Sequence, residues 1–281
     1  MLRDLIEFAQ NPYPWHLAPM GYVREARLIA KRARDLEPAW SGHIQATRRC
    51  IEASVDLCRR RRTVVVVGSG VLLDVPLEVL GRAFDRVVLL DIFHTRATRR
   101  AARKRSNVVL LPTDVTGVVR RVFVAARRRA VGRLPKSDPP VLDVRDVDLI
   151  ISVNLLSQLG VIPCNFLKGH HPAIPPAQLD AFTRDLIDAH LRWLVQSAER
   201  VCLITDVERT ESLTGGAVIR KDIVAGVDLP RPDDMWDWRI APLGGIYRDR
   251  EVTHHVHAFR NFRPGDGRIT CPPEPSRTEA P

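Results

Sequence analysis

The chain has 281 residues, of which 45% are hydrophobic and 27% charged. This composition is sufficient for a packed core and excludes a chain that is disordered throughout. No apolar run approaches the roughly 18 residues that a membrane helix needs, and acidic residues interrupt the N-terminal stretch MLRDLIEFAQ. We therefore expect a cytoplasmic protein with no membrane partner.

The formal net charge of +10 comes from 38 arginines and only five lysines. Such an arginine excess, together with abundant Ala, Val and Pro, is also typical of a GC-rich genome. The basic residues cluster at 59–62, 99–105 and 120–133, without the interleaved aromatic side chains of a platform for single strands. Solvated helix faces are the simpler interpretation, and nucleic-acid binding stays an alternative.

The cysteine and histidine pattern points to no metal site. The five cysteines are widely spaced without a CxxC pair, which excludes the usual zinc knuckles and argues against a disulfide framework. His255 and His257 fall on one face of a predicted strand, but no third ligand accompanies them. We expect no metal.

Residues 1–62 are predicted to form an N-terminal helical cap. Apolar residues recur at helical spacing from Tyr22 to Ala33, and Pro38 suits the first turn of a second helix. We expect this cap to pack on the main domain.

Short apolar runs then alternate with helical patterns. The runs are apolar on both faces, which is typical of central parallel strands covered by helices, and the alternation predicts right-handed crossovers. The predicted strands are 64–67, 87–90, 108–111, 147–153 and 201–205.

The segment 160–176 carries four prolines and is predicted to be a long loop that overhangs the carboxyl ends of the strands. His170 and His171 lie in it and are weak candidates for a general base, because histidine titrates near neutrality. Exposed loop histidines are the simpler interpretation.

The C-terminal part follows a different pattern. Residues 236–242 and 252–259 resemble strands, and the roughly nine residues between them are too few for a helical crossover, so we expect an antiparallel hairpin. Pro, Gly and charged residues dominate 263–281, which we expect to be a disordered tail.

The most informative motif is a strand, then Gly68-Ser69-Gly70, a helix, a second strand and Asp91. Glycine lets a ligand approach the backbone, and an acid about twenty positions further on can accept both hydroxyls of a ribose. Two nucleoside cofactors fit this pattern. Leu73 stands where a dinucleotide site has its third glycine or alanine, and a dinucleotide fold normally continues with parallel strands, so an NAD(P) oxidoreductase is the weaker alternative.

Over residues 60–262 the chain resembles the class I S-adenosylmethionine-dependent methyltransferases. The resemblance rests on 64–70, 88–91, 113–115, 148–154 and the terminal hairpin. It implies a Rossmann-like domain over 63–262, with a seven-stranded, mostly parallel sheet whose last strand is antiparallel. It also implies S-adenosylmethionine as the cofactor.

The resemblance further assigns the cofactor-binding residues: Gly68, Ser69, Gly70, Asp74, Asp91, Ile92, Asp114, Val115, Asn154 and Leu155. In that family the glycine loop holds the methionine part of the cofactor. Asp91 would hold the ribose and Asp114 the adenine amino group. Asn154 and Leu155, with Gln158, would face the methyl group and the substrate.

Three departures from the family pattern matter. Val66 replaces the usual acid before the loop, and Leu72 replaces the third glycine. Asp74 either caps the next helix or replaces the missing acid, and both alternatives stay open. Asn154 is not followed by the Pro-Pro-aromatic pattern of enzymes that methylate nucleic-acid amines.

The sequence therefore predicts methyl transfer from S-adenosylmethionine to a small-molecule acceptor, a reaction that depends mainly on positioning. A non-catalytic methyltransferase-like binding or scaffold protein and an RNA methyltransferase are the alternatives, because the fold alone does not choose between them.

Overall fold

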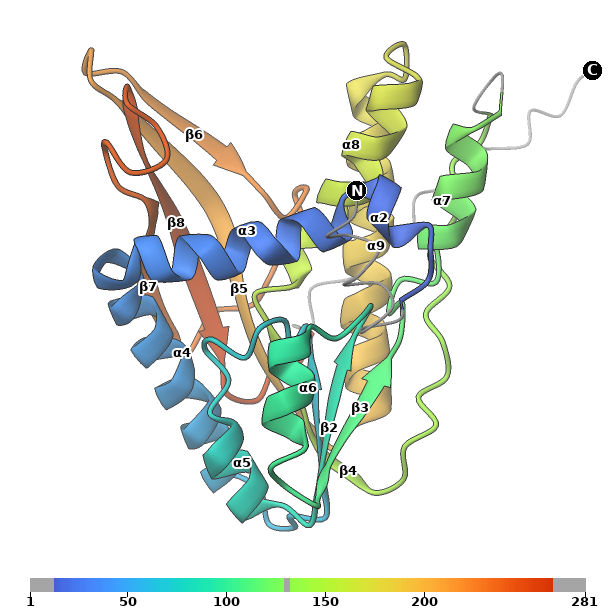
Figure 1. Ribbon diagram of the computed structural model, residues 1–281, viewed down its shortest axis with the longest axis vertical. Coiled ribbons are helices and arrows are strands. Elements are labelled where there is room, and N and C mark those ends of the chain that lie inside the picture. Colours follow the sequence, from blue (N-terminus) through green and yellow to red (C-terminus); the bar gives the residue numbers. More distant parts are fainter. Residues whose placement is uncertain (1–12, 129–131, 265–281) are drawn as a thin grey trace, which may run out of the picture.

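The computed structural model describes residues 13–128 and 132–264, so the predicted tail lies almost entirely outside the described residues. In these segments one sheet has the strand order β3-β2-β1-β4-β5-β8-β7, and β6 pairs with the outer part of β5 (Figure 1). The strands from β1 to β5 that are neighbours in this order run parallel, whereas β6, β7 and β8 pair antiparallel. The predicted Rossmann-like class and the antiparallel hairpin are confirmed.

The bounds of the strands follow the sequence pattern closely at the centre of the sheet. They are β1 (Thr63–Val67), β2 (Arg86–Asp91), β3 (Val108–Pro112), β4 (Val147–Val153), β5 (Arg200–Leu213), β6 (Val218–Asp222), β7 (Asp234–Ala241) and β8 (Arg250–Phe259). All five residues of β1 are buried. Their β-branched side chains pack against helices on both faces of the sheet, which is why a continuous apolar run predicted this strand correctly.

Two layers of helices cover the sheet. Val65 and Val67 face one core, which also contains residues of α2, α3, α7, α8 and α9, while Val64 and Val66 face a second core shared with α4 and α5. The bounds are α2 (Leu17–Met20), α3 (Tyr22–Asp35), α4 (Glu37–Asp56), α5 (Leu77–Ala83), α6 (Arg96–Ala102), α7 (Val119–Ala126), α8 (Val161–His170) and α9 (Pro176–Ser197), with a 3₁₀ turn at Leu156–Gln158.

Helix α4 joins the N-terminal part of the chain to the C-terminal hairpin. Pro38 lies in its first turn, as predicted. Trp40 is 2% exposed, donates its indole N–H to the carbonyl of Ile240 at 3.1 Å, and meets the ring of Trp238 edge to face. The N-terminal helices thus pack on the sheet, while the division into a cap over 1–62 and a domain over 63–262 stays a prediction.

The prediction of a long loop over 160–176 is wrong, because helix α8 occupies most of this segment. Pro163 lies in the first turn of α8, where a backbone N–H has no partner within the helix, so the proline does not break it. Helix α9 begins at Pro176 as predicted.

The outer part of the sheet also differs from the prediction. Strand β5 continues beyond the predicted 201–205 to Leu213, and β6 adds an eighth strand to the seven that were expected. Every residue of β6 is exposed, so its sequence has no buried face and no period to detect. None of the helices within 13–128 and 132–264 is long and apolar enough to cross a membrane.

Replacing Trp40 by alanine is expected to lower the free energy of unfolding by about 3–5 kcal/mol, because it removes a buried aromatic side chain between α4 and β7. Urea unfolding measures this loss. Trp15→Ala is the matched control, since Trp15 is 63% exposed, and it should cost less than about 1 kcal/mol. Equal losses in the two variants would contradict the described attachment of α4.

Candidate functional site

A cavity of about 380 Å³ lies at the carboxyl ends of β1, β2 and β4. Its walls include Gly68 and Gly70 after β1, Asp91 at the end of β2 and Asn154 after β4, and residues of α3 line its opposite side. In an open α/β sheet this is the point where the strand order reverses, because β1 has β2 on one side and β4 on the other. The fold therefore brings together strand ends that are far apart in the sequence.

The glycine loop needs its glycines for two different reasons. Gly68 has φ +76°, and a Cβ there would lie 3.0 Å from the Cβ of Leu155 and 3.2 Å from the carbonyl oxygen of Val153. Gly70 has φ +48°, but a Cβ there would meet only one atom within 4 Å, at 3.8 Å, so a side chain would extend into open space. Leu72, which replaces the third glycine, also has positive φ, at 60°. A non-glycine residue in this region costs roughly 1–2 kcal/mol.

Asp91 connects the second strand to this loop. One carboxylate oxygen accepts the backbone N–H of Gly70 at 2.7 Å, and the other accepts that of Ile92 at 2.7 Å. Burial raises the pKa of Asp91 to about 6, against the opposing effect of these hydrogen bonds. A carboxylate has about four acceptor positions, and the N–H groups of Gly70, Ile92 and Phe93 use three of them, so one position remains for a ribose hydroxyl.

Asp114 lines the cavity but is already engaged in a local structure. One of its oxygens accepts the backbone N–H and the hydroxyl of Thr116, at 3.0 and 2.6 Å, and the other accepts the N–H of Val119 at 2.8 Å. These bonds satisfy free N–H groups at the start of α7. The proposed contact with an adenine amino group stays a prediction for this residue.

Asn154, directly after β4, lines the cavity, and its side chain is positioned by contacts with Asp74 and His43. Its amide nitrogen donates to the Asp74 carboxylate at 2.6 Å and lies 3.0 Å from the His43 ring. Asp74 does not cap the next helix, because α5 begins at Leu77 and has no side-chain cap. That alternative for Asp74 is wrong. Burial raises the pKa of Asp74, and the hydrogen bond from Asn154 opposes the rise.

Most of the residues predicted for cofactor binding line the one cavity: Gly68, Gly70, Asp91, Ile92, Asp114, Val115, Asn154 and Leu155. Ser69 and Asp74 do not line it. Ser69 is buried, and its hydroxyl has no partner within the described segments. Asp74 touches the site only through Asn154.

The two candidate histidines lie elsewhere. His170 is the last residue of α8, with its ring nitrogen 2.9 Å from the carbonyl oxygen of Phe166. His171 follows it, with a ring nitrogen 2.9 Å from the carbonyl oxygen of Ala126. Neither lines the cavity. Their prediction as residues overhanging the site is wrong, because it depended on a loop that is a helix.

The sequence did not single out the residues of α3 that line the cavity, Tyr22, Arg24, Glu25 and Ile29. Burial and the nearby charges of Asp114 and Asp91 raise the pKa of Tyr22 well above its usual value, so its hydroxyl stays protonated. Helical periodicity predicted α3 itself. Periodicity does not indicate, however, where a helix packs relative to the sheet.

No known protein family and no curated protein matches the sequence. Among solved structures, the chain is similar to a DhpI–SAH complex at 16% identity, covering 86% of this chain and 97% of that one, with a TM-score of 0.34. It is also similar to the 1,6-didemethyltoxoflavin-N1-methyltransferase of Burkholderia thailandensis bound to S-adenosylhomocysteine, at 12% identity, with 86% and 90% covered and a TM-score of 0.39.

A third similar structure, described as a Zn-dependent alcohol dehydrogenase of Rhodobacter sphaeroides, is 15% identical, with 57% of this chain and 46% of that one covered and a TM-score of 0.31. The likenesses thus include both SAH-bound proteins and a dehydrogenase. They do not distinguish S-adenosylmethionine from NAD(P) as the cofactor, so the distinction rests on the residues of the cavity.

Gly68→Ala is expected to lower the free energy of unfolding by about 2 kcal/mol or more, because it adds a crowded Cβ to an unfavourable φ. Gly216→Ala is the matched control. Gly216 also has positive φ, at +86°, but a Cβ there would meet nothing within 4 Å, so only about 1 kcal/mol is expected. Urea unfolding compares the two, and a smaller loss in Gly68→Ala would show that the loop is not packed against Leu155.

Proposed function

We propose that this protein transfers a methyl group from S-adenosylmethionine to a small-molecule acceptor. The observation that carries the proposal is the meeting of the glycine loop, Asp91 and Asn154 at one cavity, at the switch point of the sheet. This arrangement offers an open backbone, a carboxylate and an amide to a single ligand. A cytoplasmic location is part of the same proposal.

The residues present fit an adenosyl cofactor. The space beside Gly70 is open, so an extended ligand can run along the loop. The Asp91 carboxylate keeps an acceptor position beside its backbone donors, and a ribose hydroxyl is a matching donor. Asn154 lines the cavity from the side of β4, and its amide oxygen is buried without a hydrogen-bond partner within the described segments. Such an atom gains a hydrogen bond if a ligand supplies the donor.

The geometry speaks against a dinucleotide. A dinucleotide site places the pyrophosphate at the N-terminus of the helix that follows the glycine loop. Here α5 begins only at Leu77, several residues after Gly70, and Pro76 occupies its N-cap position. Gly70 is tied instead to the Asp91 carboxylate, whose negative charge would repel a phosphate at this point.

When bound, S-adenosylmethionine supplies an electrophilic methyl group on a sulfonium. The chain's own contribution is then to position the two reactants and to exclude water. Tyr22, Arg24 and Ile29 of α3 lie across the cavity from the strand ends. The limited volume between α3 and the sheet supports an acceptor of small size. None of the described residues that line the cavity is a histidine, so the proposed transfer relies on positioning rather than on a histidine base.

The direct test is thermal unfolding with S-adenosylmethionine, S-adenosylhomocysteine, NAD and NADP, each in excess. A ligand at 100 times its dissociation constant stabilises the folded state by about 2.7 kcal/mol, so the two adenosyl ligands are expected to raise the Tm by a few degrees. Asp91→Ala should lose this shift. Asp85→Ala is the matched control, since Asp85 is exposed at the opposite end of β2 and should keep it.

A shift with NAD or NADP alone would overturn the proposal in favour of an oxidoreductase. No shift with any of the four ligands, in a protein that unfolds cooperatively, would favour the non-catalytic scaffold. An equal shift in wild type and Asp91→Ala would mean that the ligand binds elsewhere.

Cofactor affinity should also depend on pH in a defined direction. Because the pKa of Asp91 is raised to about 6, the carboxylate that accepts the ribose is lost as pH falls through 6. The dissociation constant of S-adenosylhomocysteine should then rise up to about tenfold per pH unit, as calorimetry between pH 5 and 8 would measure. The folding stability of the ligand-free protein should change with pH in the opposite direction. Because the pKa of Asp91 is higher in the folded state than in the unfolded state, the free energy of unfolding falls as pH rises from about 4 to 6. A flat affinity profile would contradict a ribose contact with ionised Asp91.

A further inference from the structure

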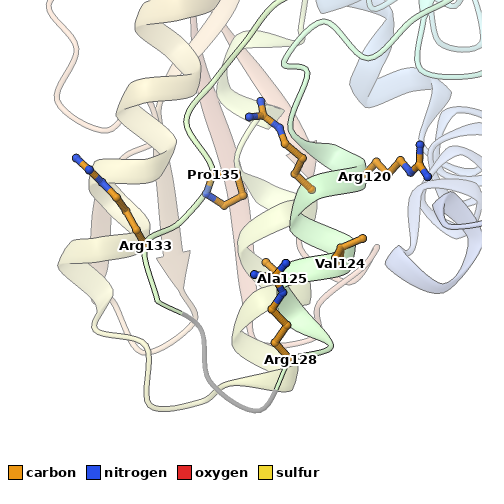
Figure 2. Close-up of a pocket in the computed structure, with 7 residues that line it drawn as sticks. Arg120, Val124, Ala125, Arg128, Arg133 and Pro135 are labelled. Carbon is orange, nitrogen blue, oxygen red and sulfur yellow. The ribbon is translucent and has the colours of Figure 1, made fainter.

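A second hollow, separate from the cofactor cavity, lies on the outer face of α7. It has a volume of about 570 Å³, opens to solvent, and is bordered by α7 and the segment that carries Arg133 and Pro135 (Figure 2). Among the residues that the structure describes, four arginines line it and no acidic residue does. The lining consists of Arg120, Arg121, Val124, Ala125, Arg128, Arg133 and Pro135.

One of the four arginines fixes the walls of the hollow. The Arg121 guanidinium donates to the carbonyl of Gly117 at 2.9–3.0 Å and to that of Lys136 at 2.9 Å, which fastens the following segment to the helix. Gly117 supports the same contact, because its φ is +63° and a Cβ there would lie 1.9 Å from the carbonyl oxygen of Asp138. The two walls are therefore held in place before any ligand arrives.

The other three arginines are available. Arg120, Arg128 and Arg133 are exposed, and within the described segments none of their guanidinium groups has a hydrogen bond or an ion pair. Several arginines elsewhere are matched by carboxylates, as Arg250 is by Glu211. Figure 2 shows the side chains of Arg120 and Arg133 extending to opposite sides of the hollow. Together with Arg128 they place three unmatched positive charges along this surface, which attract an anion. A GC-rich genome explains why the chain has many arginines. It does not explain why several of them line one hollow with no carboxylate among the described lining residues.

The spacing favours an anion with several charges. Arg120 lies in the first turn of α7, and Arg128 follows two residues after the helix ends, so the two arginines flank the two ends of a helix about 12 Å long. A chain of phosphates can meet both positions at once. Between them Val124 is 46% exposed and offers an apolar floor.

An aromatic side chain flanks the same helix, although the sequence around the arginines predicted none. Trp15 is 63% exposed, and its ring lies nearly perpendicular to that of Phe123, with 4.9 Å between the two ring centroids. The Arg127 guanidinium lies over the Phe123 ring at 4.8 Å. An exposed indole beside basic residues is a surface on which an unpaired base can stack.

We propose that α7 and Trp15 form a binding surface for single-stranded nucleic acid, in which Arg120, Arg128 and Arg133 contact successive phosphates and Trp15 stacks on a base. The surface adjoins the cofactor cavity, because Thr116 and Val119 at the start of α7 line that cavity. The proposal does not depend on methyl transfer. RNA binding is measured without cofactor, and cofactor binding without RNA, so each can fail separately.

The test uses the full-length protein and a fluorescein-labelled single-stranded RNA of 12 nucleotides, with binding followed by fluorescence anisotropy from 50 to 200 mM KCl. The affinity is expected to fall steeply with salt. The triple variant Arg120→Ala, Arg128→Ala, Arg133→Ala should bind at least tenfold more weakly. Its salt dependence should be shallower by a slope of about 2, at about 0.7 for each phosphate contact that is lost. Arg121 is left intact because it fastens the wall.

The matched control is the triple variant Arg59→Ala, Arg60→Ala, Arg86→Ala. These residues are exposed and lie at the opposite, amino-terminal edge of the strands, and the change in net charge is the same. Its affinity should change less than twofold. Trp15→Ala should weaken binding about tenfold with an unchanged salt slope, since it removes stacking and not a charge.

The proposal is overturned if the wild type fails to bind the RNA at 50 mM KCl, or if the two triple variants lose affinity equally. It is also overturned if polyglutamate or inorganic phosphate displaces the labelled strand as well as unlabelled RNA does, since the surface would then be a general anion site. Retained cooperative unfolding of each variant checks that the loss is not one of folding. If the α7 triple variant does not fold, the affinity of Trp15→Ala and the salt dependence of the wild type test the proposal instead.

Discussion

The carboxylate of Asp91 is the interaction on which the site depends. It ends β2, accepts the N–H of Gly70 from the loop after β1, and also accepts the N–H that follows it in its own chain. Two parallel strands are thereby linked at their carboxyl ends. The carboxylate still lines the cavity, and its burial raises its pKa to about 6. One group therefore shapes the glycine loop and supplies the charge that a ribose needs.

A buried polar layer supports the other wall of the cavity. Asp74 fixes the amide of Asn154, and His43 lies behind it, stacked on Trp238 at 3.9 Å, with burial lowering the pKa of His43 to about 3. A second group links the 3₁₀ turn after β4 to β5 and β8: Ser157 donates to Asp206, and a His254 ring nitrogen contacts the other oxygen, each at 2.5 Å. Burial raises the pKa of Asp206, but the hydrogen bond and electrostatic interaction with His254 outweigh burial, so the pKa lies below its usual value. The tip of β4 is thus held by groups from elements distant in sequence.

The sequence predicted most of the sheet and most of the wall formed by strand ends, because both follow from local patterns. Four consecutive valines predict a buried strand, and an acid 21 positions after Gly70 falls at the end of the next one. The failures have a common cause. Helix α8 contains a proline in its first turn, β6 has no buried face, and the lining by Tyr22 and its neighbours depends on how α3 lies over the sheet. Trp15 reaches α7 only through the tertiary fold. None of these has a local signal.

The central claim is that the cavity at the ends of β1, β2 and β4 is an adenosyl site. A crystal structure of the protein with S-adenosylhomocysteine tests it most directly. The account predicts a ribose hydroxyl on the Asp91 carboxylate, the methionine part along the Gly68–Gly70 loop, and the sulfur facing Asn154. Electron density for the ligand outside this cavity, or a ribose that makes no contact with Asp91, would contradict it.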